Sequence, residues 1–528
     1  MSESGSGGPH RGQLTAVAAV LAASVLLSRV LGYVRDAVLA WRIGATAEAD
    51  AYYAAFILPD LLNHLLAGGA LAIAFIPFYT RLRSSAGEDG AAHFLAGVLG
   101  TTSAFAVLLT GVLWWQADAL VAVQFPRFAP ETRALAAYLT RILLPAQIFF
   151  IAGGVIRGAL MAHGCFTTQA LAPVLYNFAI IVGGLALGGT LGAEGFAWGA
   201  LAGAILGPFL APLFEVRRAG ISRIRLRFAP FDRDFVHYLV VALPLMIGVS
   251  LITVDEWYGR WFGALLPSGT VAHLAYARRL MLVPVAIVGQ AIATAALPLL
   301  ARFWAEGRPD EMHRTLLETL RAGVGLSVLA SVAFLVFAEP LVTLLYERGR
   351  FGSADTLQVV ALLRIFAFAV PGWVVQQIAV RAFYARGDTW RPMLLATGIA
   401  LAAAALYWFL GERYAAPGLA WAGVLGMSAS ALATLALARR LHAGPALRPL
   451  LATALRATAS AALAGVFTAA SIRALPLPAA GALRALCALA AGGAIYAAVT
   501  LVAVRWIGDA PLQAAVRRAV RPLRRRAR

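Results

Sequence analysis

The chain has 528 residues, of which 61% are hydrophobic and 13% are charged, and its mean hydropathy is +0.78. Soluble domains carry about 25% charged residues, so this composition excludes an ordinary soluble protein and indicates a multi-pass membrane protein. The formal net charge is +19, and it comes from arginine because the sequence contains no lysine. Most of these arginines lie in short loops between apolar segments, which argues against nucleic acid as a partner. With Cys165 and Cys487 as the only cysteines, a disulfide framework and a cysteine metal cluster are also excluded.

The apolar segments follow one another along almost the whole chain. Residues 1–13 are rich in Gly and Ser and are expected to be disordered. The first apolar segment is expected to be a retained helix rather than a cleaved signal peptide, because many more segments follow it. About fourteen spans are expected, at 14–40, 51–79, 92–116, 135–161, 169–190, 193–214, 235–260, 270–302, 316–338, 355–385, 391–410, 417–438, 451–472 and 479–504.

Short internal matches predict that the first twelve spans are a duplication. AIAFIPFYTR at 72–81 resembles AIATAALPLLAR at 291–302, and ALMAHG at 159–164 resembles AFYARG at 382–387. Both pairs are separated by nearly the same number of residues. A unit with an even number of spans keeps its orientation when it is copied, so the two lobes should form a parallel repeat.

The predicted fold is therefore all-α, with two six-helix lobes in parallel repeat and two additional C-terminal helices. The expected segments are an N-lobe at 14–215, a basic cytoplasmic linker at 216–234, a C-lobe at 235–440, helices 13 and 14 at 451–504 and a basic tail at 505–528. Loop arginines are strongly biased: with the N-terminus inside, roughly two dozen lie on the inner side and fewer than about ten on the outer side. This bias predicts that both termini are cytoplasmic.

The stretch from Ser28 to Asp50 carries charge without interrupting the first apolar segment. Arg29, Arg35 and Asp36 lie within it. A charged side chain near the centre of a bilayer costs roughly 2.5–3.5 kcal/mol, so such residues usually face a cavity and have a function there. The alternative is that these charges lie in a loop or form structural ion pairs. We interpret Arg29 and Arg35 as cavity residues.

Further arginines lie inside or at the ends of other spans and predict an anionic substrate. Guanidinium groups bind phosphate oxygens through two parallel hydrogen bonds and stay charged at physiological pH. For Arg141, Arg260 and Arg381 the favoured alternative is that the side chain reaches the lipid headgroups. No phosphate loop, HExxH or CxxC motif occurs in the sequence, and lone histidines such as His64 and His273 are typical of structural hydrogen bonding. An enzyme is therefore not expected, and neither a metal site nor a cofactor.

Several motifs together resemble one transporter family. They are SRVLGYVRDAVLA, ADAYYAAFILPDLL and GGALAIAFIPFYTRLRSSAGEDGA near the N-terminus, then PLMIGVS, HLAYARRLMLVP, LYERGRF and FYARGDTWRP. They resemble the MurJ (MviN) family of lipid II flippases, within the MOP exporter superfamily, over about residues 14–440. The N-terminal block is the most specific part of the resemblance.

The resemblance implies a flippase of the bacterial cytoplasmic (inner) membrane that moves lipid-linked peptidoglycan precursor, lipid II, from the inner to the outer leaflet by alternating access. It implies a cationic cavity for the pyrophosphate-sugar headgroup and a groove at helices 13 and 14 for the polyprenyl tail. The family residues of importance correspond here to Ser28, Arg29, Arg35, Asp36 and Asp50. We expect Arg29, Arg35 and Arg279 to bind the pyrophosphate, and Asp36 or Asp50 to couple transport to a cation or to the membrane potential.

The sequence also departs from the family pattern at several positions. Asn63 and His64 stand where many members have two arginines, and they become substrate-binding candidates with altered charge. Gly68 and Leu282 each replace a glutamate, and Arg278 replaces an acidic residue in the pattern YADRL. Asp255 or Glu256 is a candidate to balance Arg278, so Asp255 and Arg278 are proposed gating residues.

These departures leave a second function open, which is export of another polyprenyl-pyrophosphate-linked glycan. The remaining alternatives are a drug exporter, a membrane enzyme acting on polyprenyl phosphates and a scaffold for cell-wall assembly. The expected partners are the lipid-linked precursor, membrane lipids and the cell-wall synthesis machinery. The protein is expected to work as a monomer.

Overall fold

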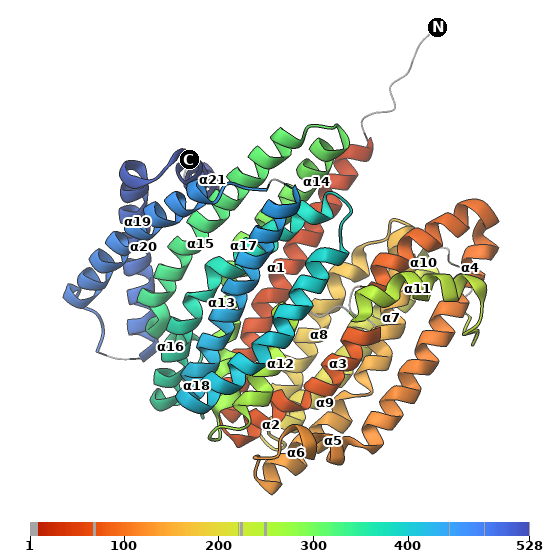
Figure 1. The fold of residues 1–528 in the computed structure, drawn as a ribbon. Coiled ribbons are helices and arrows are strands. Elements are labelled where there is room, and N and C mark those ends of the chain that lie inside the picture. Colours follow the sequence, from red (N-terminus) through yellow and green to blue (C-terminus); the bar gives the residue numbers. More distant parts are fainter. Residues whose placement is uncertain are drawn as a thin grey trace. The chain divides into compact units, whose positions relative to one another are not determined.

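The structure is a computed structural model that describes residues 9–66, 70–219, 221, 225–247, 251–442, 444–479 and 481–526. In the described residues the regular structure is helical (Figure 1). The chain divides into two compact units, Met1–Gly248 (unit 1) and Val249–Arg528 (unit 2). Each unit is described by itself below. The all-α polytopic fold predicted from the sequence is confirmed.

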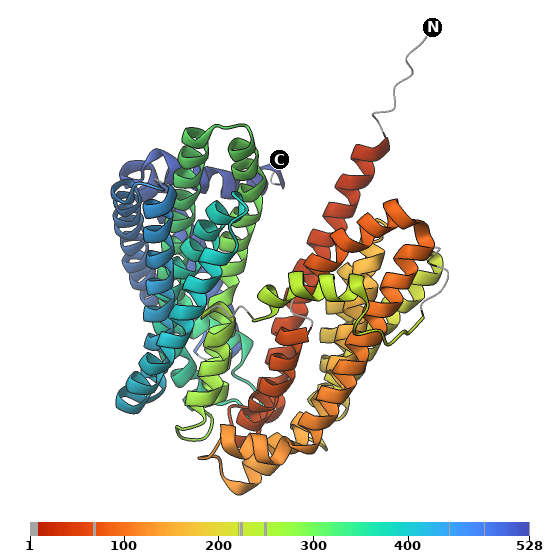
Figure 2. The same ribbon diagram turned by 45° about the vertical axis from the view of Figure 1, so that its right-hand side comes forward.

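Unit 1 contains eleven α-helices and one π-helical turn among its described residues. They are α1 (Pro9–Ile43), α2 (Ala47–Ala55), α3 (Ile57–Leu66), α4 (Ala70–Trp115), α5 (Ala117–Gln124), α6 (Pro130–Leu143), α7 (Ala146–Ala162), α8 (Thr167–Ala186), α9 (Ala193–Ala204), η1 (Ile205–Leu210), α10 (Ala211–Arg218) and α11 (Arg233–Ile247). Figure 2 shows α1, in red, along its whole length. Since α1 begins at Pro9, helix already occupies part of the segment expected to be disordered, 1–13; residues 1–8 lie outside the described residues.

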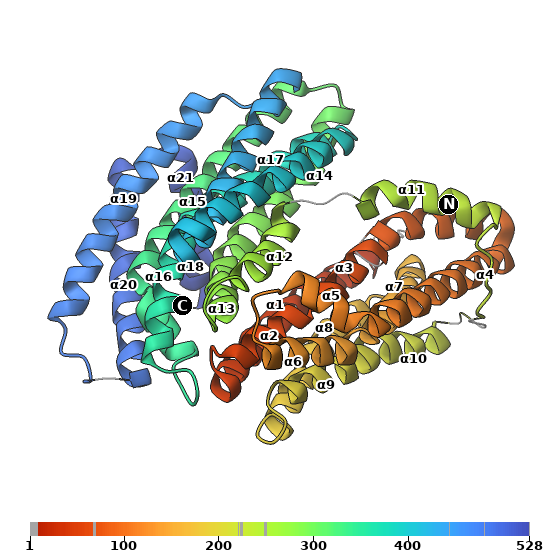
Figure 3. The same cartoon turned by 60° about the horizontal axis from the view of Figure 1, so that its bottom comes forward.

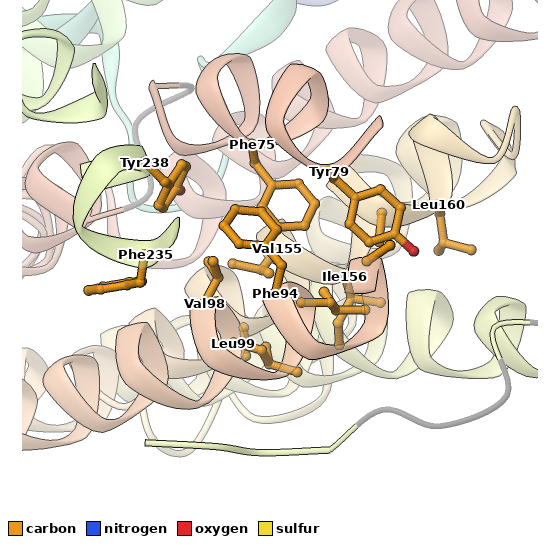
Figure 4. Packing of buried hydrophobic residues seen from close by; sticks show 14 of the residues in the cluster. Phe75, Tyr79, Phe94, Val98, Leu99, Val155, Ile156, Leu160, Phe235 and Tyr238 are labelled. Carbon is orange, nitrogen blue, oxygen red and sulfur yellow. The ribbon is translucent and has the colours of Figure 1, made fainter. Parts of the chain in front are cut away.

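An aromatic cluster forms the core of unit 1. Phe75 and Phe94, which lie on the two arms of α4, stack with 5.5 Å between ring centroids. The two arms are possible because Gly87 breaks α4 with a φ of 72°, a left-handed conformation that glycine adopts without strain. Tyr238 of α11 closes the cluster edge-on, 5.9 Å from the Phe94 ring (Figure 4).

The packing of α11 concerns the region of the predicted boundary between the lobes, which stays a prediction. The span expected at 235–260, at the start of the C-lobe, is divided into α11 and α12 (Leu251–Gly263), and residues 248–250 lie outside the description. Helix α11 belongs to unit 1, because Tyr238 is fully buried among the aromatic rings of α4. The predicted basic linker at 216–234 likewise lies in unit 1. The backbone N–H of Arg227 donates to the Ala96 carbonyl of α4 at 3.0 Å.

Unit 2 contains the remaining helices of the described chain. They are α12 (Leu251–Gly263), α13 (Thr270–Pro284), η2 (Val285–Gln290), α14 (Ala291–Ala305), α15 (Pro309–Leu345), α16 (Ser353–Ala367), α17 (Ala369–Tyr384), α18 (Trp390–His442), α19 (Leu447–Ala474), α20 (Gly481–Ile507) and α21 (Ala510–Arg526). Helices α19 and α20, predicted as the two helices outside the repeat, pack together beside α15 (Figure 3). Tyr496 of α20 donates a hydrogen bond to the Leu329 carbonyl of α15 at 2.7 Å.

The described helices are long and apolar enough for a multi-pass membrane protein. Nine segments, each a single helix or a run of consecutive helices, satisfy length and hydropathy criteria for crossing a bilayer, and the bent pair α16–α17 would make a tenth. Helix α18 has 53 residues and is kinked at Ala415, whose φ is 51°. This kink falls between the two spans predicted at 391–410 and 417–438. The count of fourteen spans stays a prediction.

Candidate functional site

In unit 1, the predicted site residues of α1 are joined by a partner on α8. The Nε of Arg35 donates to Asp36 Oδ1 at 2.9 Å, and Arg35 Nη2 lies 2.8 Å from the same oxygen. Arg35 Nη1 donates to Asn177 Oδ1 at 3.2 Å. The Asn177 amide then donates to Ser28 Oγ at 3.3 Å. Three of the five predicted residues of the Ser28–Asp50 stretch therefore belong to one network.

The network compensates most of the cost of burying charge. Asp36 is only 4% exposed, and a buried carboxylate needs an ion pair and hydrogen bonds. The three contacts of Arg35 use three of the five N–H groups of its guanidinium. Arg29 lies half-buried on the same helix, two turns before Asp36. Chemically, α1 presents two guanidinium groups and a carboxylate that is already paired.

Asp50 lies in α2, where the structure also shows a role for its neighbour Glu48. Asp50 is 2% exposed, in the first turn of the helix. Glu48 Oε1 accepts a hydrogen bond from the backbone N–H of Ala193 at 2.6 Å, which fastens α2 to the start of α9. A Cβ at Gly192 would lie 1.9 Å from that oxygen, so the contact needs glycine there. Glu48 is thus the structural carboxylate of this region, and coupling through Asp50 stays a prediction.

Asn63 and His64 lie together on α3. The Asn63 amide donates to Gln147 Oε1 of α7 at 2.9 Å. Since Gln147 is 6% exposed, this contact is part of the packing between the two helices. His64 is half-buried one residue further along α3. The structure thus gives Asn63 a packing contact and leaves substrate binding by either residue a prediction. Gly68, the next departure from the family pattern, lies outside the described residues.

Other arginines of the spans also have protein partners. Arg157 of α7 donates to the Pro208 carbonyl of the π-helical turn η1 at 2.7 Å. Arg141 Nη1 donates to Asp118 Oδ1 at 3.0 Å, and this hydrogen bond lowers the pKa of Asp118. In unit 2, Arg260 pairs with Glu256 one turn earlier. Arginine in a span is therefore not sufficient evidence for an anion-binding cavity, because several of these cations are neutralised or hydrogen-bonded by the protein itself.

In unit 2, the two predicted gating residues are in direct contact. Arg278 Nη1 of α13 pairs with Asp255 Oδ2 of α12, and the Tyr407 hydroxyl of α18 donates to Asp255 Oδ1. The three residues are 8%, 5% and 1% exposed, respectively. Of the two acidic candidates, Asp255 is therefore the partner of Arg278, while Glu256 pairs elsewhere. Arg279, the next residue of α13, is half-buried.

The space around this carboxylate is closed. A Cβ at Gly423 of α18 would lie 2.7 Å from Asp255 Oδ1 and 3.0 Å from the Tyr407 hydroxyl oxygen. On the other side, the Arg278 guanidinium carbon lies 5.6 Å from the centre of the Trp373 ring, within the range of a cation–π interaction. Arg278, which stands where the family pattern has an acidic residue, is thus neutralised by Asp255, and the pair carries no net charge.

Sequence reasoning did not find three partners that complete these sites, namely Asn177, Gln147 and Tyr407. Each is an uncharged polar residue inside an apolar span, and that was the available signal. Such residues usually make hydrogen bonds between helices. Their partners lie more than 80 residues away in the chain, so no local pattern identifies them. Across the described part of the chain, no group of three or more His, Cys, Asp and Glu residues is placed to hold a metal ion.

Comparison with known proteins places the chain in a family. The family model described as Lipid II flippase MurJ matches residues 39–477. A probable lipid II flippase MurJ from Rhizobium meliloti (strain 1021) is 32% identical over 521 residues, which cover 95% of each chain. The lipid II flippase MurJ from Burkholderia cenocepacia (strain J2315) is 28% identical over 390 residues, covering 71% of this chain and 74% of its own.

Solved structures show a similar fold. The structure titled "Lipid II flippase MurJ, inward closed conformation" superposes with a TM-score of 0.77 at 21% identity, covering 92% of this chain and 98% of that one. An inward-facing multidrug resistance MATE transporter of the MOP superfamily gives a TM-score of 0.67 at 18% identity, covering 79% and 94%. The match over most of the chain and the relatives of similar length show that the chain belongs to the MurJ family of lipid II flippases.

Proposed function

We propose that this protein is a transporter that moves lipid II from the inner to the outer leaflet of the cytoplasmic membrane. The observation that carries the proposal is the family match over residues 39–477, in a chain whose described part holds nine helices, or ten with the bent pair, of membrane-spanning length. The arginine network of α1 supports it, because a lipid-linked pyrophosphate is a multiply charged anion. The family match favours lipid II over another polyprenyl-pyrophosphate-linked glycan as the substrate.

The proposed binding residues in unit 1 are Arg29 and Arg35. The Arg35 guanidinium is held in place by Asp36 and Asn177, so it is oriented before substrate arrives. A pyrophosphate would compete with Asp36 for the same guanidinium. Binding would therefore loosen the ion pair, and re-forming the pair would help to release the substrate. Arg279 is the corresponding candidate in unit 2.

The driving force is proposed to be the membrane potential or a coupled cation. Asp36 and Asp50 are the candidate carboxylates, because both are buried within helices of unit 1. If Asp50 couples transport, Asp50→Asn should abolish flipping and leave binding of lipid II unchanged. Normal flipping by well-expressed Asp50→Asn protein would remove Asp50 from the mechanism.

Localisation and assembly are part of the proposal. Both termini are assigned to the cytoplasm by the arginine bias of the loops. The protein is proposed to work as a monomer in the inner membrane, with access to the cell-wall synthesis machinery, and without a resident cofactor.

Rescue of a depleted strain tests the proposed function. A bacterium depleted of its own lipid II flippase would receive the wild-type protein, Arg29→Ala, Arg35→Ala or the control Arg141→Gln. Arg141 pairs with Asp118, a largely exposed residue, and has no role in the proposed site. Growth, expression level and the leaflet in which lipid II accumulates would be measured together.

Wild type and Arg141→Gln are expected to rescue, and the two α1 variants are expected to fail. Rescue by Arg29→Ala would keep the function and exclude Arg29 from it. Failure of well-expressed wild type would contradict lipid II as the substrate. Asn63, His64 and Arg278, where the chain departs from the family pattern, would then be the first residues to examine for a different glycan.

A further inference from the structure

The C-terminal helix α21 separates its apolar and basic residues onto opposite sides. Leu512 and Val516 are buried in a cluster with residues of α15, α19 and α20, whereas Arg517 and Arg518 are exposed. A helix turns 100° per residue, so Arg517 and Arg518 lie on the side of α21 that faces away from Leu512 and Val516. The segment predicted as a basic tail is therefore an amphipathic helix docked on unit 2.

A buried ion pair fixes the start of this helix. Asp509, which is 7% exposed, accepts a hydrogen bond from Arg321 Nη2 of α15 at 2.8 Å, and its Oδ2 lies 2.5 Å from Thr453 Oγ1 of α19. Arg321 Nε also donates to Thr453 Oγ1 at 2.9 Å. The other carboxylate oxygen accepts from the Leu512 backbone N–H at 3.2 Å, which caps α21. Helix α21 thus has a defined position on the bundle and a defined rotation about its own axis.

Helix α21 is docked at the point along α15 where the sequence of α15 changes from charged to apolar. Leu512 packs directly on Gly325 of α15, where a Cβ would lie 2.4 Å from the leucine Cδ1. The charged residues in the first part of α15 end at Arg321, and the stretch from Ala322 to Ala338 that follows contains no charged residue. In a membrane helix this transition marks the boundary between headgroups and acyl chains. Helix α21 therefore lies at headgroup depth.

The same end of unit 2 carries the loops assigned to the cytoplasm. Arg386, in the loop after α17, donates to His313 at the start of α15 at 2.9 Å and lies over the Trp304 ring of α14 at 4.9 Å. Figure 1 shows α21 at this end, beside α15 and α19. The leaflet next to α21 is therefore the cytoplasmic one, whose phospholipids include anionic headgroups.

From these observations we infer that α21 is an interfacial helix whose arginine face binds anionic phospholipid headgroups of the cytoplasmic leaflet. Its apolar face is occupied by the protein, so the exposed arginines are the part that contacts the surroundings. At headgroup depth, the groups of complementary charge available to them are lipid phosphates. An acidic soluble protein is the other class of partner, and the experiment below excludes one of the two. The inference is independent of the substrate that the protein transports.

Hydrogen exchange of the full-length protein in lipid nanodiscs tests the inference. One set of discs contains phosphatidylcholine alone, and the other contains about 30 mol% phosphatidylglycerol, enough to give a negative surface. Amide exchange over residues 510–526 is expected to be at least about tenfold slower in the anionic discs, since each arginine contributes about a fivefold change in surface binding. Raising salt from about 0.1 M to about 1 M should remove most of the difference, because the Debye length falls from 10 to 3 Å.

Two matched variants make the result specific. Arg517→Gln/Arg518→Gln should lose most of the lipid dependence. The control Arg439→Gln/Arg440→Gln removes the same amount of charge from an exposed arginine pair at the end of α18. This variant should keep the lipid dependence of exchange in α21. Unchanged exchange in α15 and α19 would show that both variants remain folded.

Equal exchange of residues 510–526 in the two kinds of disc would overturn the inference. So would an equal loss of lipid dependence in both variants, because the effect would then come from overall charge. Slow exchange that occurs only when cytoplasmic proteins are added would assign the arginine face to a protein partner instead.

Discussion

The buried pair of Asp255 and Arg278 offers the most direct test of how unit 2 is stabilised. We consider three variants: Asp255→Asn, Arg278→Met and the double variant. Asparagine keeps the shape of the carboxylate and can still accept the hydrogen bond from Tyr407. Methionine replaces the arginine stem beside Trp373 without a charge. A charge swap is the weaker test, because Gly423 leaves no room for an arginine at position 255.

Each single variant leaves one charge buried without its partner. Loss of one member of a buried ion pair costs about 3–5 kcal/mol, whereas replacing both members with neutral groups is often close to neutral. The free energy of unfolding of the double variant is therefore expected to lie within about 1 kcal/mol of the wild-type value. The destabilising effects of the two single variants should be strongly non-additive. At about 2 °C per kcal/mol for a domain of this size, the single variants should melt about 6–10 °C lower.

The assay is thermal unfolding of the purified full-length protein in detergent, with lipid II binding measured on the same samples. Glu306→Gln serves as control, because Glu306 pairs with Arg302 and Arg308 at an exposed loop, where solvent screens the charges and ion pairs contribute little to stability. If the destabilisation of the double variant equals the sum of the two single destabilisations, the reasoning is refuted. The two side chains would then contribute to the stability of the protein independently.

Three further predictions follow from single contacts. Gly423→Ala should destabilise the protein by about 1–3 kcal/mol, measured by thermal unfolding, because the new methyl group would overlap Asp255; an unchanged melting temperature would contradict this packing. Asn177→Leu should weaken binding of lipid-linked pyrophosphate about tenfold, measured by titration, because Arg35 loses a hydrogen bond that orients it; unaltered affinity would separate Asn177 from the site. Burial raises the pKa of Asp509, but its hydrogen bonds to Thr453 and to the Arg321 guanidinium outweigh burial and hold the pKa below the ordinary value. The stability that Asp509 contributes is therefore complete above about pH 4 and is lost as the pH falls through the lower folded pKa. The protection of residues 510–526 against exchange, corrected for the intrinsic pH dependence of amide exchange, should therefore fall in acid for wild type, and Asp509→Asn should show no such acid-dependent loss. Protection in wild type that does not change in acid would refute this prediction.

The sequence by itself determined the class of protein, the helical architecture and the family. These are properties of composition and local periodicity, which are visible without knowing which helices touch. The N-terminal motif SRVLGYVRDAVLA and the separate spans predicted at 391–410 and 417–438, between which α18 is kinked at Ala415, are examples. The arginines and carboxylates of α1 were also identifiable, because a charge in an apolar segment is conspicuous in any window.

The tertiary structure alone decided which charges remain available and which are neutralised. The sequence offered Asp255 and Glu256 as alternative partners of Arg278, and only the structure selects Asp255. Asn177 reaches Arg35 across 142 residues, and no spacing in the sequence predicts that contact. The placement of α11 with unit 1 depended on Tyr238 fitting among the rings of α4, and that of α21 on a single buried aspartate. Local patterns specify which surface of a helix is apolar, but the partner of that surface is chosen by long-range packing and by the cost of leaving a buried charge unpaired.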